Sequence, residues 1–368
     1  MHLLLLTREF PPHVVGGVAY HAYNLAQELA AEGHEITVLT AADGDRTVNG
    51  FDPPDGIDII SIDCPTTASP RLWFDRAVRR ELTESDLLGS IDVIHSHEYV
   101  QFDKLPTDTP ALLKVHFNIR RKLEFFPFDQ YPRGVRLLLA LVLRYGIMPL
   151  EYRLAKKSLR TADGRLFISD LTKRESERFG HADGASRVIH NGVDADRFTR
   201  TIDSSEDYFL FVGGTQTRKG YDTVMQTFHQ TDSTLKIAGA ERPPGTTAPE
   251  NIEFLGYIEQ RELPALYSNA RALVHPALYE PFGNIVLESL ACGTPVIVSN
   301  ARHCGAAELL SETVSVTVDP ERPGEFQDAV ESFSPDNYSP EACRSLARQY
   351  GWQDVATETT VFASSLSQ

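Results

Sequence analysis

The sequence of 368 residues has few cysteines, fewer basic than acidic residues and no low-complexity segment. Its four cysteines lie far apart and form no CxxC pair, so they predict neither a disulfide framework nor a zinc site. Aspartate and glutamate number 51 against 35 lysines and arginines, which gives a formal net charge of -16. Because nucleic acid binding depends on neutralising phosphates, this charge argues against nucleic acid as a partner.

Long apolar runs are also missing, since a membrane-spanning helix needs roughly 20 apolar residues. The most lipid-like stretch, 137–148, is shorter and is interrupted by Arg144. The segment before it, 120–128, places basic residues beside aromatic ones and leaves two interpretations open. It forms a packed loop before a core helix, or it brings the N-terminal domain to the inner face of a membrane as a peripheral contact.

The first seven residues have no basic region and too short an apolar run for a signal peptide. We therefore expect a cytoplasmic protein that begins with a buried strand.

The N-terminal half alternates between apolar runs and helical spacing. A run at 3–6, a Gly16-Gly17 turn, a helical pattern ending at Gly33 and a second run at 36–39 predict a βαβ unit. Further strands are expected at 57–62, 92–95, 112–117, 165–168 and 188–190. Such alternation indicates a doubly wound parallel sheet.

The pattern restarts at 208–212, where a second buried run leads into glycines. The strands that follow are expected at 235–238, 252–255, 272–275 and 295–298. The length suits two domains, and we predict an α/β protein with two Rossmann-like domains facing each other across a cleft. The first spans 1–185 and the second 186–351, while a last helix at 352–368 is expected to pack on the first.

The strongest local motif runs from Glu280 to Pro295. Pro281 and Gly283 predict a loop entering a helix, whose first N–H groups are free to bind oxyanions or sugar hydroxyls. Glu280 and Glu288 can accept hydrogen bonds from vicinal hydroxyls, one set on a hexose and the other on a ribose. The alternative is a pair of solvated glutamates beside a helix cap.

A second motif, 213–220, follows the buried strand of the second half. Arg218 and Lys219 suit a diphosphate that gains negative charge as it leaves, although the segment matches neither GxxxxGK[ST] nor GxGxxG. Solvated surface cations are the alternative.

Histidines mark the ends of two strands in the first half. His116 ends the predicted strand 112–117 and is either a structural residue or one that projects into the cleft. The run His95-Ser96-His97-Glu98 suggests a metal site, but spacing marks no third ligand, so no metal is predicted.

Taken together, these motifs resemble the family 4 retaining glycosyltransferases, which have the GT-B fold. The resemblance covers nearly the whole chain and rests on an ordered set: Gly16-Gly17, His116, Asn191-Gly192-Val193-Asp194 with Arg197-Phe198, Arg218-Lys219-Gly220, the Glu280 to Glu288 motif with Cys292 to Ile297, and the Trp352 helix.

The resemblance implies a role for each matching residue. The catalytic residues would be His116, which contacts the sugar near the reacting carbon, Glu280 and Lys219. The donor would be bound by Gly16, Gly17, Arg218, Lys219, Glu280, Phe282, Gly283, Asn284 and Glu288. One position departs from the family pattern, because Gly214 stands where an arginine is common, and this weakens the diphosphate assignment.

The function implied is transfer of a hexose from a UDP- or GDP-linked donor to a glycan, a lipid-linked acceptor or a small molecule. The anomeric configuration would be retained, and neither a metal nor a cofactor would be needed. Two alternatives stay open: a nucleotide-sugar epimerase or hydrolase of the same fold, and a non-catalytic subunit that binds sugar nucleotides.

Overall fold

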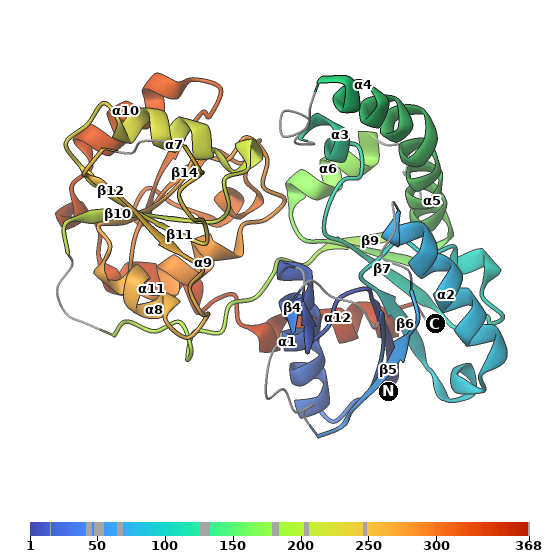
Figure 1. The fold of residues 1–368 in the computed structure, drawn as a ribbon. Coiled ribbons are helices and arrows are strands. Elements are labelled where there is room, and N and C mark those ends of the chain that lie inside the picture. Colours follow the sequence, from blue (N-terminus) through green and yellow to red (C-terminus); the bar gives the residue numbers. More distant parts are fainter. Residues whose placement is uncertain are drawn as a thin grey trace. The chain divides into compact units, whose positions relative to one another are not determined.

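The computed structural model describes residues 1–14, 16–41, 46–47, 55–64, 69–125, 133–178, 184–201, 206–245 and 249–366. It divides into two α/β units, each with its own parallel sheet (Figure 1). The first unit contains Met1–Ile168, Thr172–His190 and Trp352–Gln368, and the second contains Ser169–Leu171 and Asn191–Gly351.

The sheet of the first unit has seven parallel strands in the order β5-β3-β1-β6-β7-β8-β9. The third strand in this order, β1, contains four consecutive leucines, all of them buried, because helices cover both faces. The strands are β1 His2–Thr7, β3 Glu35–Ala41, β5 Ile57–Ile62, β6 Val93–Ser96, β7 Ala111–Val115, β8 Gly164–Phe167 and β9 Ala185–Val188.

Helices α1 (Gly17–Ala31) and α12 (Trp352–Ser364) lie side by side on one face of this sheet (Figure 1). They share an apolar cluster with Leu3 and Leu5. The other face packs against α2 (Pro70–Glu84) and α5 (Met148–Thr161).

The remaining elements are β2 His13–Val14, β4 Arg46–Thr47, η1 Leu87–Ser90, η2 Phe102–Lys104, α3 Arg121–Glu124, α4 Arg133–Leu141, the π-helical turn η4 Val142–Ile147 and α6 Asp170–Arg178.

The second unit has six parallel strands in the order β12-β11-β10-β13-β14-β15. Figure 1 shows α7 and α10 on one face of this sheet, with α8 and α11 on the other. The strands are β10 Tyr208–Val212, β11 Thr234–Ala238, β12 Ile252–Gly256, β13 Ala272–His275, β14 Val296–Ser299 and β15 Ser315–Val318. The helices are η5 Thr217–Lys219, α7 Tyr221–Phe228, α8 Leu263–Asn269, α9 Asn284–Ala291, η6 Gly305–Leu309, α10 Pro323–Ser332, η7 Pro335–Asn337 and α11 Pro340–Ala347.

Two details differ from the expected layout. Strand β9 begins at Ala185 and pairs with β8, so residues 186–190 belong with the first sheet and the division falls after His190. Strand β15 is not among the strands expected from the sequence, because Ser315 and Thr317 interrupt the apolar run that marks the buried strands.

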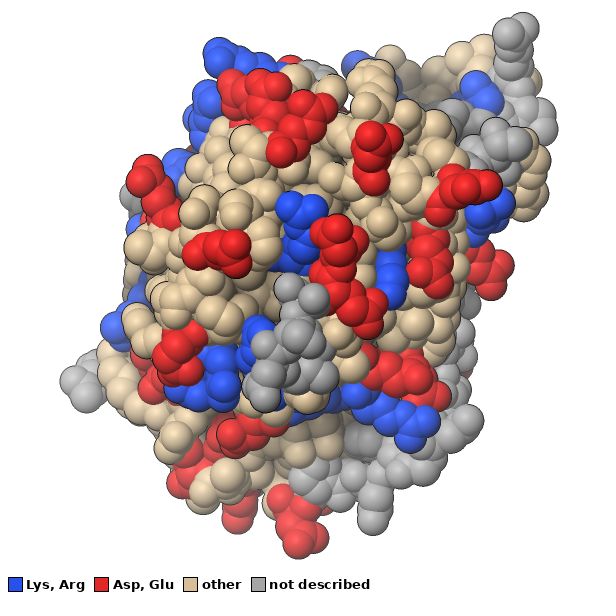
Figure 2. Space-filling model, turned by 90° about the vertical axis from the view of Figure 1, so that its left-hand side faces the viewer, with Lys and Arg blue, Asp and Glu red and all other residues tan. Residues whose placement is uncertain are grey.

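Charge on the surface is mixed. The face drawn in Figure 2 carries acidic and basic side chains interspersed among uncharged ones, unlike the clustered basic surface that binds a phosphate backbone.

Among the described residues, no helix is both long and apolar enough to cross a bilayer. The stretch 137–148 instead forms the end of α4, the turn η4 and the first residue of α5. Leu143 packs into the core, whereas several other apolar side chains are exposed to solvent: Val135, Leu137, Leu138, Leu141, Val142 and Tyr145. Of the segment 120–128, residues 126–128 lie outside the described part of the chain.

The packing of α12 generates a test. Replacing Trp352, which is buried against the first unit, with alanine should destabilise that unit by about 3 kcal/mol through loss of buried aromatic surface. Hydrogen exchange should show faster exchange in β1 and unchanged exchange in β10. Val361→Ala, at an exposed position of the same helix, is the control and should change stability by less than about 0.5 kcal/mol. Equal loss of protection in β1 and β10 would contradict the assignment of α12 to the first unit.

Candidate active site

The loop that carries Glu280 is fixed by backbone hydrogen bonds on both sides. It connects β13 to α9, and the Glu280 N–H donates to the carbonyl of His303 at 2.7 Å. The carbonyl of Glu280 accepts from the Gly305 N–H at 3.0 Å, and that of Phe282 accepts from Ala306 at 2.8 Å. The loop is therefore held against the segment that follows β14.

The Glu280 carboxylate lies beside positive charge and remains 16% exposed. Its Oε2 is 3.5 Å from Arg218 Nη1 and 3.7 Å from His275 Nε2. Burial alone would raise the pKa of Glu280, but the His275 imidazole and the charges of Lys219 and Arg218 outweigh burial and lower the pKa to about 2. Glu280 is thus a permanently ionised hydrogen-bond acceptor near neutral pH.

The basic segment after β10 is joined directly to this loop. Arg218 and Lys219 lie in η5, and the Arg218 carbonyl accepts from the Tyr279 N–H at 3.1 Å. Gly220 ends the turn with a φ of 78°, and a Cβ there would lie 2.1 Å from the carbonyl oxygen of Pro276. Only glycine fits this turn, which places both basic side chains near Glu280.

The glycines before the basic segment differ from each other. At Gly213, a Cβ would lie 3.0 Å from Cδ of Lys219, so the lysine side chain runs close along this backbone. At Gly214, the nearest atom to a built Cβ is Nε2 of Gln216 at 3.8 Å. Packing therefore leaves room for a side chain at position 214. The fold does not explain why glycine stands where the family pattern favours arginine.

Glu288 lies in α9 and is held by one strong contact. The Tyr267 hydroxyl donates to its Oε2 at 2.9 Å. Burial raises the pKa of Glu288 to about 6, although Tyr267, Arg197 and Lys219 oppose the shift. Its carboxylate is partly accessible, so it can still accept further hydrogen bonds.

The residues between the two glutamates have separate structural roles. The Phe282 side chain is buried, so only its backbone can face a ligand. Gly283 has a φ of 98° and precedes α9 without a side-chain cap. The Asn284 side chain accepts from Asn191 Nδ2 at 2.9 Å, which connects the start of α9 to the junction motif 191–194.

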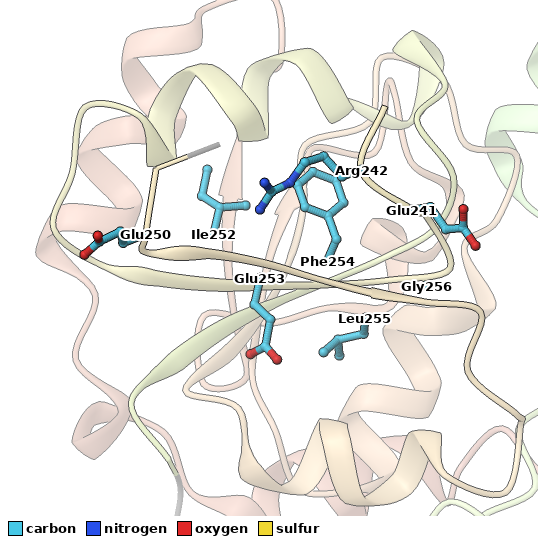
Figure 3. Close-up of a pocket in the computed structure, with 8 residues that line it drawn as sticks. All are labelled: Glu241, Arg242, Glu250, Ile252, Glu253, Phe254, Leu255 and Gly256. Atoms are coloured by element: carbon cyan, nitrogen blue, oxygen red, sulfur yellow. The ribbon is translucent and has the colours of Figure 1, made fainter. Parts of the chain in front are cut away.

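A surface hollow of about 670 Å³ also lies in the second unit, along the edge strand β12 (Figure 3). Figure 3 shows Ile252 and Phe254 on one side of the strand with Arg242, and Glu253 and Leu255 on the other. The Arg242 guanidinium is 5.8 Å from the centre of the Phe254 ring. The lining contains none of the predicted site residues.

In the first unit, Gly16 and Gly17 precede and begin α1. The Gly16 N–H donates to Oε2 of Glu9 at 3.0 Å. A Cβ at Gly16 would meet only that oxygen, at 4.0 Å, and one at Gly17 would meet no atom within 4 Å. Packing against the described residues thus does not require glycine at either position.

The structure also assembles charged residues that the sequence motifs did not single out. Arg8 and Glu9 follow β1 and form an ion pair, while Glu98 follows β6. Glu98 lies 3.6 Å from Nε of Arg8 and 3.5 Å from Nε of Arg71. Their one signal in the sequence is their position just beyond predicted strands, where ligands of parallel sheets bind.

His116 follows β7 directly and lies, half-buried, beside the buried histidines His21 and His97. Its Nε2 lies 3.0 Å from Nδ1 of His97, which follows β6. His21 on α1 faces both, and one nitrogen of each of the three rings lies within 4.8 Å of the others. Spacing in the sequence could not mark this third residue, because the sheet and α1 bring it close.

A second group of potential ligands, His303, Asp319 and Glu321, is more exposed.

Two family models match consecutive parts of the chain. Residues 15–197 match Glycosyltransferase Family 4, and residues 193–350 match Glycosyl transferases group 1. A glycogen synthase of Mycobacterium tuberculosis is 26% identical, over 98% of this chain and 93% of its own length.

Solved structures show the same fold at low identity. A sucrose-phosphate synthase from Thermosynechococcus elongatus superposes with a TM-score of 0.77 at 17% identity, covering 99% of this chain and 98% of its own. The HepE protein of Anabaena, solved with UDP and glucose, gives a TM-score of 0.69 at 16% identity and covers 99% of this chain and all of its own. The protein is a glycosyltransferase with the GT-B fold, and the chain belongs to glycosyltransferase family 4.

Proposed function

We propose that this glycosyltransferase moves a hexose from a UDP- or GDP-linked donor to a glycan, a lipid-linked acceptor or a small molecule. One observation carries the proposal: an ionised Glu280 lies 3.5 Å from Arg218 in a loop tied by a hydrogen bond to the Arg218-Lys219 turn. The carboxylate suits sugar hydroxyls, and the cations suit a diphosphate. Because HepE was solved with UDP, UDP-linked hexoses are the first donors to test.

In this proposal Glu288 accepts hydrogen bonds from the ribose, while the backbone from Phe282 to Asn284 binds the sugar and phosphate. Gly16 and Gly17 let the backbone of the first unit approach the donor, which would explain bare glycines where no neighbouring atom requires them. His116 contacts the sugar as a neutral imidazole, because burial, Lys114 and His95 hold its pKa well below the usual value.

The proposed reaction retains the anomeric configuration. The bond from the anomeric carbon to the phosphate oxygen breaks, with Lys219 and Arg218 stabilising the charge that develops on the diphosphate. The acceptor oxygen attacks from the same face, and its proton passes to the departing phosphate oxygen. With a pKa near 2, Glu280 is too weak a base to take that proton, so its role is to bind and stabilise. No step in this scheme uses a metal.

Two rival functions predict other outcomes with a radiolabelled donor. An epimerase would form a new sugar nucleotide and a hydrolase would release free sugar, both without an acceptor. A non-catalytic subunit would bind the donor and leave it intact. The proposed transferase needs an acceptor for turnover, so assays with and without acceptor separate the three.

Alanine substitutions test the charge assignments. Lys219→Ala and Glu280→Ala should each lower kcat at least about tenfold, because Lys219 stabilises the charge that develops on the diphosphate and Glu280 orients the sugar through its hydroxyls. Donors are first identified by thermal shift with UDP, GDP and ADP sugars, and kcat is then measured by labelled transfer. Arg261→Ala, at an arginine of the same unit that is 79% exposed and pairs only with Glu259 among the described residues, should keep the wild-type kcat. Unchanged turnover in both active-site variants would remove these assignments.

The raised pKa of Glu288 predicts a pH dependence of donor affinity. As pH falls from 7.5 through about 6, Glu288 becomes protonated and loses acceptor capacity for the ribose hydroxyls, so the Kd for the sugar nucleotide should rise. Isothermal titration between pH 5 and 7.5 measures this change. Glu288→Gln should bind more weakly than wild type and lack this dependence. The same pH profile in both proteins would assign the titration to another group.

We also propose that the exposed apolar side chains of α4 and η4 contact an anionic membrane surface. Leu137 and Leu138 are 66% and 64% exposed, and Tyr145 is 72% exposed. Residues 133–150 contain three arginines and no acidic residue, in a chain with a net charge of -16. An exposed apolar face with local positive charge is typical of helices that lie at a lipid interface.

Vesicle binding tests this contact. The full chain should sediment with phosphatidylglycerol vesicles more than with phosphatidylcholine vesicles, and binding should weaken as salt increases. Leu138→Asp should reduce binding at least about fivefold, because a leucine side chain no longer enters the apolar boundary. Val361→Asp alters a similarly exposed residue on α12 and should not affect binding. Equal losses in the two variants would rule out α4 as the contact.

A further inference from the structure

A cavity of about 50 Å³ lies in the first unit, where β6 and β7 end. Its wall contains Arg71 from α2, Glu98 after β6, Lys114 from β7 and His116. Two of these side chains are cationic and one is a carboxylate, in a chain with a net charge of -16. The proposed transfer uses only His116 among them, so the cations of this cavity need another explanation.

Lys114 is a lysine inside a buried strand. It is 1% exposed, and its Nζ has no hydrogen-bond partner among the described residues. Burial lowers the pKa of Lys114 to about 7. The Glu358 carboxylate, which opposes this shift, is itself 3.7 Å from Nε of Arg187. An oxyanion in the cavity would stabilise the charged form of Lys114 more directly.

The Glu98 carboxylate at the cavity wall is shared between two arginines. Its Oε1 is 3.6 Å from Nε of Arg8, and its Oε2 is 3.5 Å from Nε of Arg71. A guanidinium carries five N–H donors, more than this contact of Arg71 through Nε uses. Arg71 therefore contributes donors as well as charge to the cavity, in the planar arrangement that suits phosphate.

The His97 imidazole supplies a further donor to the same cavity. It is 4% exposed, and its Nε2 has no partner among the described residues. Its Nδ1 lies 3.0 Å from Nε2 of His116. When His116 donates this hydrogen bond, the N–H of a neutral His97 is on Nε2. Buried polar atoms without partners are rare in folded proteins, so Nε2 of His97 and Nζ of Lys114 together indicate a ligand that accepts hydrogen bonds.

The size of the cavity favours a phosphate group as this ligand. One water needs roughly 10–15 Å³, so a cavity of about 50 Å³ accommodates three or four oxygens. A phosphate monoester presents three acceptor oxygens and close to two negative charges near neutral pH. Arg71 and Lys114 match the charge of such a group, and His97 adds a neutral donor.

We propose that this cavity binds a phosphate group on the acceptor, through Arg71, Lys114 and His97. The inference rests on the proposed function, in which the Arg218-Lys219 turn binds the donor diphosphate and His116 contacts the sugar near its reacting carbon. Because His116 also lines the cavity, a phosphate bound there places the rest of the acceptor beside the carbon that its hydroxyl attacks. The acceptor class is therefore a phosphate monoester that carries hydroxyl groups.

The test measures binding of inorganic phosphate to the full chain saturated with UDP, or with GDP if the thermal-shift screen selects it. The bound nucleotide keeps phosphate out of the donor site. Isothermal titration should show one phosphate bound per chain, with acetate at the same ionic strength binding at least about tenfold more weakly. Arg71→Met and Lys114→Met should each weaken phosphate binding at least about tenfold, because each loses a charge-assisted hydrogen bond.

Arg80→Met is the matched control, since Arg80 is an exposed arginine of the same helix as Arg71. It should bind phosphate as the wild type does. An equal loss there would overturn the proposal, because general surface charge would then explain the binding. Absence of phosphate binding to the wild type, or equally tight binding of acetate, would overturn it as well. Thermal unfolding checks that the variants fold.

Inhibition kinetics separate the acceptor from the donor. Inorganic phosphate should inhibit sugar transfer in competition with the acceptor and not with the nucleotide sugar, and Lys114→Met should leave the Kd for the nucleotide within about twofold. Competition with the donor, or a larger loss of nucleotide affinity, would assign the cavity to the donor and refute the proposal. The titration contains no donor sugar, so the two proposals fail separately. Sugar transfer without phosphate binding would reject only this inference, and phosphate binding without sugar transfer would reject only the proposed function.

Discussion

A carboxylate that leaves water becomes harder to ionise unless positive charge lies within a few ångströms. Glu280 meets this condition through Lys219 and Arg218 on the turn after β10, while the imidazole of His275, at the end of β13, also favours the ionised form. The carboxylate and the basic residues come from segments that are distant in the sequence. Two backbone hydrogen bonds hold these segments together. Tyr279 donates to Arg218, and Glu280 donates to His303. The arrangement of side chains around this carboxylate therefore depends on three strands ending at the same edge of one sheet.

The same topology explains what the sequence could predict. Buried parallel strands are nearly continuous apolar runs, so β1, β5, β10 and β13 were located within a residue or two at most. The edge strand β15 was missed because it is only partly buried and alternates with polar residues. The boundary after His190 was placed too early because pairing of β9 with β8, and not local sequence, decides which sheet the segment joins.

The site divides in a similar way. Glu280, Glu288 and the Arg218-Lys219 turn stand in short motifs, and the structure brings Glu280 and the turn together within one unit. Their protonation could not be predicted, because the opposite shifts of Glu280 and Glu288 depend on contacts with His275 and Tyr267. His21 and Arg71 were invisible as site residues, since helices place them beside strand ends far away in the sequence. Long-range packing therefore determines the electrostatics, whereas local motifs determine only which residues are present.

Segments of the first unit lie on both sides of the second unit along the chain. Apart from Ser169–Leu171, the second unit is one continuous insertion, Asn191–Gly351. Its two ends lie together, because the Val193 N–H donates to the carbonyl of Tyr350 at 2.8 Å and Val193 forms a bridge with Gly351. A segment whose two ends are adjacent can be replaced by the corresponding segment of a relative, because no added linker is needed at either junction. Chimaeras with relatives could thus be assembled at one point of the backbone, leaving α12 and the sheet on which it packs unaltered.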